Sequence, residues 1–138
     1  AARAFMQRGG HDTALDVLES ALNREWHEDL VGRYGEVRGS NPVRQIEQAE
    51  KWLHAAPRDA QLLLTLAQLC SVQQLWGKAQ SYLEASLAVA PSCAAHIELA
   101  RLFDRLERSE DANRHYRAAA SCQATGPQIQ SRGSRKSV

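Results

Sequence analysis

Apolar residues return along this chain at a fixed interval of 33 positions. The interval separates Ala67 from Ala100 and Cys70 from Phe103. It also separates three further pairs, Ala79 and Ala112, Leu83 and Tyr116, and Ser86 and Ala119. Within each repeat the apolar positions lie three or four residues apart, as on one face of a helix, and no stretch alternates with period two. The pattern therefore predicts an all-α fold in which a pair of helices is repeated.

Residues that start and stop helices set the expected boundaries. Asp59 and Ser92 each precede an apolar run and are suited to cap it, and Pro91 ends the helix before Ser92. We place the turn inside the first of these repeats at Leu75-Trp76-Gly77-Lys78. The expected helices span roughly 11–24, 25–38, 42–55, 60–73, 93–106 and 109–121, and one more holds Ala79, Leu83 and Ser86.

These helices make a repeat domain over residues 1–122, with about three and a half hairpins. Residues 1–8 are expected to be the remnant of a first helix whose partner is the helix at 11–24. The stretch 123–138 contains Arg132, Arg135 and Lys136, no acidic residue and few apolar ones. We therefore expect it to be a disordered basic tail.

Residues 60–91 resemble the tetratricopeptide repeat. Leu63, Leu66, Ala67 and Cys70 follow the large-x2-large-small-x2-large order of its first helix, and residues 93–120 follow the same order. The chain departs from the family at Leu63 and Cys70, where the ideal repeat has Trp and Tyr. The resemblance implies a right-handed superhelix of antiparallel helical hairpins, with an inner groove lined by the first helices.

The register of the repeat predicts which side chains line that groove. We expect twelve residues there: Gln61, Leu64, Thr65, Gln68, Ser71, Val72, Ala94, Ile97, Glu98, Arg101, Asp104 and Arg105. Such a mixed surface suits a protein or peptide partner. The carboxylate-clamp members of the family, which bind chaperone C-termini, need Lys and Asn at several of these positions. Leu64, Thr65, Gln68 and Ala94 stand there instead, so that ligand class is not expected.

Two strings narrow the resemblance. Glu50-Lys51-Trp52-Leu53 and the string that runs from Leu75 to Leu87 are similar to the C-terminal repeat region of the proteobacterial HemY proteins, which are linked to protohaem IX biosynthesis. The resemblance implies a scaffold for haem-biosynthesis enzymes, in a parent protein anchored in the bacterial inner membrane. The start at Ala1-Ala2-Arg3 indicates a piece of that longer protein, itself soluble. Two alternatives stay open: a generic adaptor in an unrelated assembly, and direct tetrapyrrole binding.

Candidate chemistry is sparse. No nucleophile–base order and no nucleotide-binding glycine motif occurs, so we expect no enzyme, no catalytic residue and no cofactor. The net charge of +1 points to no nucleic acid. Cys93 and His96 are three residues apart, but two further ligands are missing nearby, so no metal site is expected.

We interpret the three cysteines, Cys70, Cys93 and Cys122, as buried or half-buried thiols, and expect Trp52 and Trp76 to pack between repeats.

Overall fold

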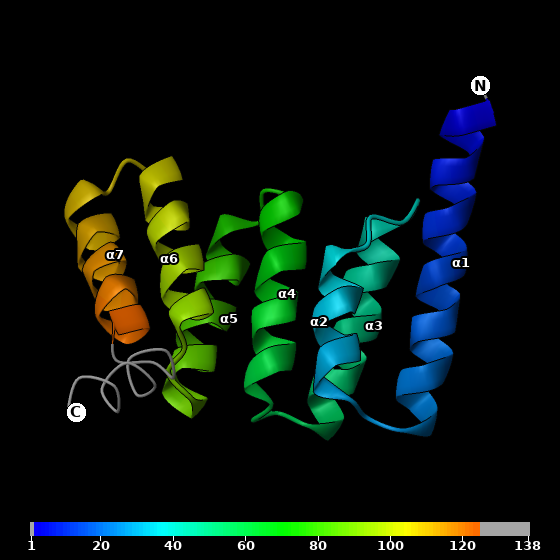
Figure 1. The fold of residues 1–138 in the computed structure, drawn as a ribbon, viewed down its shortest axis with the longest axis horizontal. Coiled ribbons are helices and arrows are strands. Elements are labelled where there is room, and N and C mark those ends of the chain that lie inside the picture. Colours follow the sequence, from blue (N-terminus) through cyan, green and yellow to red (C-terminus); the bar gives the residue numbers. More distant parts are fainter. Residues whose placement is uncertain (1, 125–138) are drawn as a thin grey trace, which may run out of the picture. The chain divides into compact units, whose positions relative to one another are not determined.

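The structure, a computed structural model, describes residues 2–124, and within that range the chain forms only helices and loops (Figure 1). The helices are α1 (Ala2–Arg24), α2 (Glu28–Glu36), α3 (Pro42–Ala55), α4 (Ala60–Val72), α5 (Trp76–Val89), α6 (Cys93–Arg105) and α7 (Ser109–Ala124). The predicted all-α class is confirmed for the described residues. Of the predicted basic tail, 125–138 lies outside the described range, whereas Gln123 and Ala124 belong to α7 rather than to a tail.

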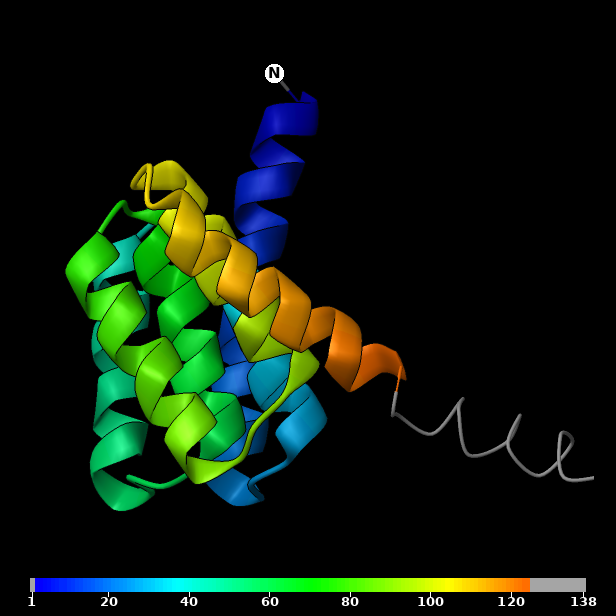
Figure 2. The same ribbon diagram turned by 90° about the vertical axis from the view of Figure 1, so that its left-hand side faces the viewer.

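The helices divide into two compact units. Unit 1, Ala1–Val89, contains α1 to α5, and unit 2, Ala90–Val138, contains α6 and α7. In unit 1, α4 packs against α2, α3 and α5, and α2 also packs against α1. Figures 1 and 2 both show α4 and α5 side by side, and α6 and α7 pair in the same way in unit 2.

The centre of unit 1 is α4. Its sequence is apolar nearly all round, which is the composition of a helix that is enclosed rather than laid on a surface. Leu62, Leu66 and Cys70 are completely buried, and Leu63 and Leu69 are nearly so. Helices α2, α3 and α5 enclose it, and burying this apolar area is the main contribution to the stability of the unit.

The 33-residue interval reappears in the caps of the first helices. The side chain of Asp59 accepts a hydrogen bond from the backbone N–H of Leu62 at 3.0 Å, at the start of α4. The side chain of Ser92 accepts one from Ala95 at 3.1 Å, at the start of α6. Both N-caps were expected from the sequence, and they satisfy amide groups that have no partner inside the helix.

The turns that end these two helices also match. Gln74 and Glu107, again 33 positions apart, have positive φ values of 61° and 59°. The N–H of Leu75 bonds to the carbonyl of Cys70, and the N–H of Arg108 to that of Phe103. A residue in the left-handed conformation, followed by an N–H that bonds to a carbonyl five residues earlier, is a common way for an α-helix to end. The hairpins α4–α5 and α6–α7 are therefore two copies of one local structure.

Two predicted boundaries were wrong. The expected turn at Leu75-Trp76-Gly77-Lys78 lies earlier, because Gln74 takes the left-handed conformation and α5 already begins at Trp76. The expected break between residues 8 and 11 is absent, and α1 runs without interruption from Ala2 to Arg24. Gly10 has open space around it, so no packing forces the chain to turn there.

Candidate functional site

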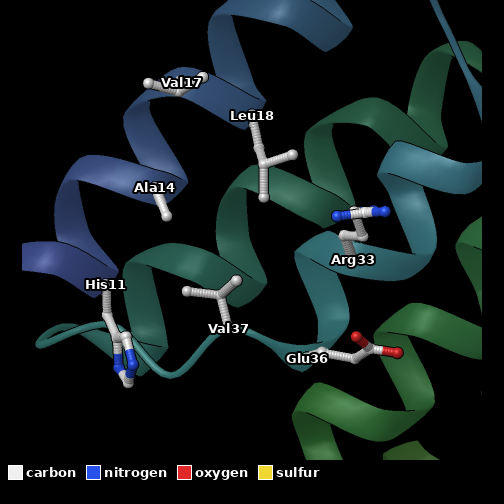
Figure 3. A pocket seen from close by; sticks show the side chains of 7 residues that line it. All are labelled: His11, Ala14, Val17, Leu18, Arg33, Glu36 and Val37. Atoms are coloured by element: carbon white, nitrogen blue, oxygen red, sulfur yellow. The ribbon is translucent and has the colours of Figure 1, made fainter. Parts of the chain in front are cut away.

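A hollow of 560 Å³ opens between α1 and the end of α2, and we call it the α1–α2 hollow (Figure 3). Figure 3 shows that α1 contributes Ala14, Val17 and Leu18, while Arg33 and Glu36 come from α2. The complete lining is His11, Ala14, Val17, Leu18, Arg33, Glu36 and Val37. Most of these side chains are apolar, and the two charges lie along one edge.

Helix α1 supplies the apolar side of this hollow with a face that its own packing leaves open. The buried face of α1 carries Leu15 and Leu22, which are 5% and 3% exposed. Val17 points away from that face and is 62% exposed. Val17 lines the hollow beside Leu18, and it therefore presents apolar surface that a ligand in the hollow would cover.

A second hollow of 540 Å³ adjoins the first, and we call it the α2–α4 hollow. Glu28 and Asp29 lie in the first turn of α2, and Gln61 reaches it from α4. Its lining is Glu28, Asp29, Gly32, Arg33, Glu36 and Gln61. Arg33 and Glu36 line both hollows, so the two form one continuous surface.

The charges on this surface are unbalanced. The α2–α4 hollow has three carboxylates, those of Glu28, Asp29 and Glu36, and one guanidinium, that of Arg33. Among the described residues, none of the four side chains makes a hydrogen bond or an ion pair. Glu28 and Asp29 are favourable where they are, because acidic groups stabilise the positive end of a helix. The combined surface is apolar at α1 and acidic at the start of α2.

The structure corrects part of the predicted groove. Thr65 is completely buried, and its hydroxyl donates a hydrogen bond of 3.0 Å to the carbonyl of Val31. Leu64 is only 8% exposed, so it belongs to the core, contrary to the expectation that packing would leave it free. Both corrections have one cause, since α4 is enclosed on several sides rather than lining a groove with one open face.

The other predicted groove residues are divided between the two units. Gln61, Gln68 and Ser71 are half-buried in unit 1, and Val72 is 46% exposed. Gln61 is the member that lines a hollow, the α2–α4 hollow. In unit 2, Ile97 and Glu98 are half-buried and the remaining four, Ala94, Arg101, Asp104 and Arg105, are exposed. Sequence reasoning did not find the α1–α2 hollow, because it looked for a groove lined by first helices alone.

The tryptophans of unit 1 have structural partners. The indole N–H of Trp52 donates to Asn23 at 3.0 Å, and its ring packs edge-on against Tyr34 at 5.0 Å and Trp26 at 5.5 Å. Trp26 in turn donates to the carboxylate of Asp59 at 2.6 Å. The packing role expected for Trp52 agrees with these contacts, which connect α1, α2 and α3.

The cysteines of unit 2 differ from the expectation. Cys93 and Cys122 form a disulfide between the start of α6 and the end of α7, so they are not simple thiols. Their pairing could not be derived from three cysteines by counting. Cys70 is free and buried, and burial raises the pKa of its thiol to about 11. Cys93 is therefore not a partner for His96, and His96 instead contacts His115.

No family model and no curated protein matches this chain. Among the described residues, no helix is both long and apolar enough to cross a membrane. The same residues contain no cluster of three or more His, Cys, Asp and Glu side chains placed to hold a metal ion.

Proposed function

We propose that this chain is a non-enzymatic scaffold that binds a helix or extended peptide of a partner protein along the two adjoining hollows. The observation that carries the proposal is the sharing of Arg33 and Glu36 by an apolar hollow and an acidic one. A ligand with an apolar stripe and basic side chains complements this surface. The apolar stripe would cover Val17 and Leu18, and Lys or Arg would pair with the carboxylates of α2.

The proposed class is the tetratricopeptide-repeat scaffold with its right-handed superhelix. Its support is the recurrence of caps and left-handed turns at an interval of 33 residues, Asp59 with Ser92 and Gln74 with Glu107. Each hairpin exposes little surface alone, and stacked hairpins of this kind bind partners over several repeats.

A finer proposal places the scaffold in haem biosynthesis, in a parent protein anchored in the bacterial inner membrane. It is supported by the two strings that resemble the HemY proteins, Glu50–Leu53 and Leu75–Leu87. The part of the parent gene that precedes the codon for residue 1 tests it. Two apolar spans ahead of residue 1 are expected, and an upstream region that encodes none contradicts it.

The scaffold proposal is tested with two labelled amphipathic peptides that share one Leu stripe and carry either Lys or Glu on the other face. Fluorescence anisotropy should show tighter binding of the Lys peptide, because it complements the carboxylates at Glu28, Asp29 and Glu36. Val17→Asp should weaken this binding by about tenfold, the effect expected of one well-covered contact.

The chain offers matched controls. Val43 on α3 is 61% exposed, against 62% for Val17, and lines neither hollow, so Val43→Asp should leave binding unchanged. Glu36→Lys should weaken binding of the Lys peptide, because it replaces one of the carboxylates in the hollow. Glu47→Lys on α3 should leave that binding unchanged. Equal affinity for the two peptides, or equal effects of Val17→Asp and Val43→Asp, would show that this surface is not the binding site.

A further inference from the structure

Unit 2 contains a pair of histidines that face each other across its two helices. His96 on α6 and His115 on α7 have their Nδ1 atoms 3.0 Å apart, and both residues are half-buried. The ring centroids are 5.2 Å apart, with the ring planes tilted by 32°. One neutral imidazole can donate its Nδ1 proton to the other; when the donor ring instead carries its proton on Nε2, both Nδ1 atoms present lone pairs at one place.

The surroundings of the pair limit how it can move. Phe103, which is 2% exposed, stacks on the ring of His115 at 5.6 Å and an angle of 25°. The guanidinium of Arg108 lies 4.6 Å from the centre of the Phe103 ring. The disulfide between Cys93 and Cys122 ties together the same two helices, one helical turn before His96. The two imidazoles are therefore held close before any ligand arrives.

We propose that His96 and His115 form a two-imidazole chelate for a divalent transition-metal ion, with Cu²⁺ as the preferred ion. Metal–nitrogen bonds of about 2.0–2.1 Å place two nitrogens about 2.9 Å apart when they are adjacent in a square plane and about 3.3 Å apart in a tetrahedron. The observed 3.0 Å, an ordinary hydrogen-bond length, lies between these two values, so both rings need to move little to bind one ion. A tilt of each ring then directs both lone pairs at one ion, and the imidazole that donated carries its proton on Nε2 in the bound state, so both ligands stay neutral.

The nature of the ion follows from the donor set. Square-planar and tetragonal sites with nitrogen and oxygen donors suit Cu²⁺ and Ni²⁺, and Cu²⁺ binds most tightly in the divalent series. Among the described residues no third side chain completes a metal cluster at this pair. Water or a donor outside these described residues would fill the remaining positions. The Cys70 thiol, whose pKa burial raises to about 11, stays protonated and does not compete for the ion.

The test uses the full chain without an affinity tag, titrated by calorimetry with Cu²⁺ supplied as its glycine complex. We expect one ion per chain and an electron paramagnetic resonance spectrum with coupling to two imidazole nitrogens. His96→Gln and His115→Gln should each weaken binding by more than about tenfold, because a single imidazole loses the second donor held at high effective concentration. His54→Gln, an exposed position on α3, is the matched control and should change nothing.

Circular dichroism shows whether each variant is still folded, and spectroscopy on the wild type provides a test that needs no variant. Binding that survives both His96→Gln and His115→Gln overturns the proposal, as does a wild-type spectrum with coupling to fewer than two imidazoles. Tighter binding of Zn²⁺ than of Cu²⁺ overturns the choice of Cu²⁺ as the preferred ion.

Discussion

Glu19 places a buried carboxylate where α1, α2 and α3 meet. It is 8% exposed, and Arg44 donates two hydrogen bonds to it, at 2.8 and 2.9 Å. The phenolic O–H of Tyr34 donates a third, at 2.7 Å. The hydrogen bonds from Arg44, reinforced by that from Tyr34, hold the pKa of Glu19 below its usual range despite burial. A charge buried in this way stabilises the fold only while its partners remain in place.

Replacing this carboxylate should reveal a pH-dependent part of the stability. The pKa of Glu19 is lower in the folded chain than in the unfolded chain, where it is about 4.3. The contribution of Glu19 to the free energy of unfolding is therefore fully present above that unfolded pKa, and it is lost as the pH falls through the pKa of the folded chain. We expect Glu19→Gln to lower the free energy of unfolding by about 1–2 kcal/mol at pH 7, with half-exposed Arg44 limiting the loss. Urea denaturation should show that the difference in unfolding free energy between the wild type and Glu19→Gln is smaller at pH 3 than at pH 7. Glu47→Gln, exposed on α3, should show no such change.

Single residues were predictable from sequence where their role is local. Asp59, Ser92 and Asn41 cap the helices that they precede, as expected, because a cap bonds to an amide only three residues away. The bond from Tyr34 to Glu19 joins residues 15 positions apart, and the histidine pair joins residues 19 apart. No helical spacing brings such residues together, so tertiary packing alone determines these contacts.

At the scale of elements, the close approach of α2 and α4 depends on a glycine. A Cβ added to Gly35 would lie 2.9 Å from the side-chain oxygen of Gln68, 3.0 Å from Cγ2 of Thr65 and 3.4 Å from its Cα. The backbone atom and the buried Thr65 side chain cannot move aside easily. We expect Gly35→Ala to destabilise the chain by about 1–3 kcal/mol, the usual range for overpacking, as measured by thermal or urea denaturation.

A second glycine on the same helix is the control. At Gly32, an added Cβ would be 3.5 Å from the Gln61 side chain, which is an ordinary contact. Gly32→Ala should therefore stabilise the chain by about 0.5–1 kcal/mol, because alanine is the better helix former. If both substitutions change stability in the same direction, α2 and α4 are not packed as described.

The disulfide of unit 2 should contribute measurably to the pairing of α6 with α7. It joins residues 29 positions apart, and cross-links of that span typically add about 2–4 kcal/mol. We expect a phosphine reductant to lower the melting temperature of the wild type. The double variant Cys93→Ser, Cys122→Ser should melt at the lower temperature with or without reductant. A wild type that is insensitive to the reductant contradicts the cross-link.

The helices themselves were largely predictable from sequence, and their ends less so. Pro42 and Asn41 fix the start of α3, and Asp59 fixes that of α4, so these boundaries were right. The turn before α5 was placed at Leu75-Trp76-Gly77-Lys78, whereas Gln74 adopts the left-handed conformation that ends α4. A non-glycine residue in that conformation leaves little trace in sequence, since its cost is offset by the helix-closing hydrogen bond of Leu75.

At the scale of the molecule, the spacing of the histidine pair bears on haem. Two axial nitrogens on opposite sides of an iron are about 4 Å apart, and those of His96 and His115 are 3.0 Å apart. We therefore expect no haem held by both imidazoles at once, and haemin titration should give no sharp spectral shift that depends on both residues. A sharp shift of the Soret band, lost in both His96→Ala and His115→Ala, would contradict this prediction and favour direct tetrapyrrole binding.

The candidate surface was less predictable than the fold. The repeat register included Gln61, which lines the α2–α4 hollow, but it also assigned the buried Leu64 and Thr65 to the surface, because it treats α4 as a helix with one open face. Contacts with α2, α3 and α5 decide how much of α4 stays open, and the sequence of α4 does not contain them. Val17 was not predicted to line a hollow, and only the placement of α1 beside α2 shows that it does.

The matched turns at Gln74 and Glu107 have a consequence for the order of folding. Each turn is specified by residues within one hairpin, and the partners α4–α5 and α6–α7 are neighbours along the chain. Contacts of such short sequence separation form early and carry a small loop-closure cost. The hairpin of α6 and α7 can therefore assemble during synthesis without waiting for distant segments. Pulse-labelled hydrogen exchange should find α4 with α5, and α6 with α7, becoming protected as pairs.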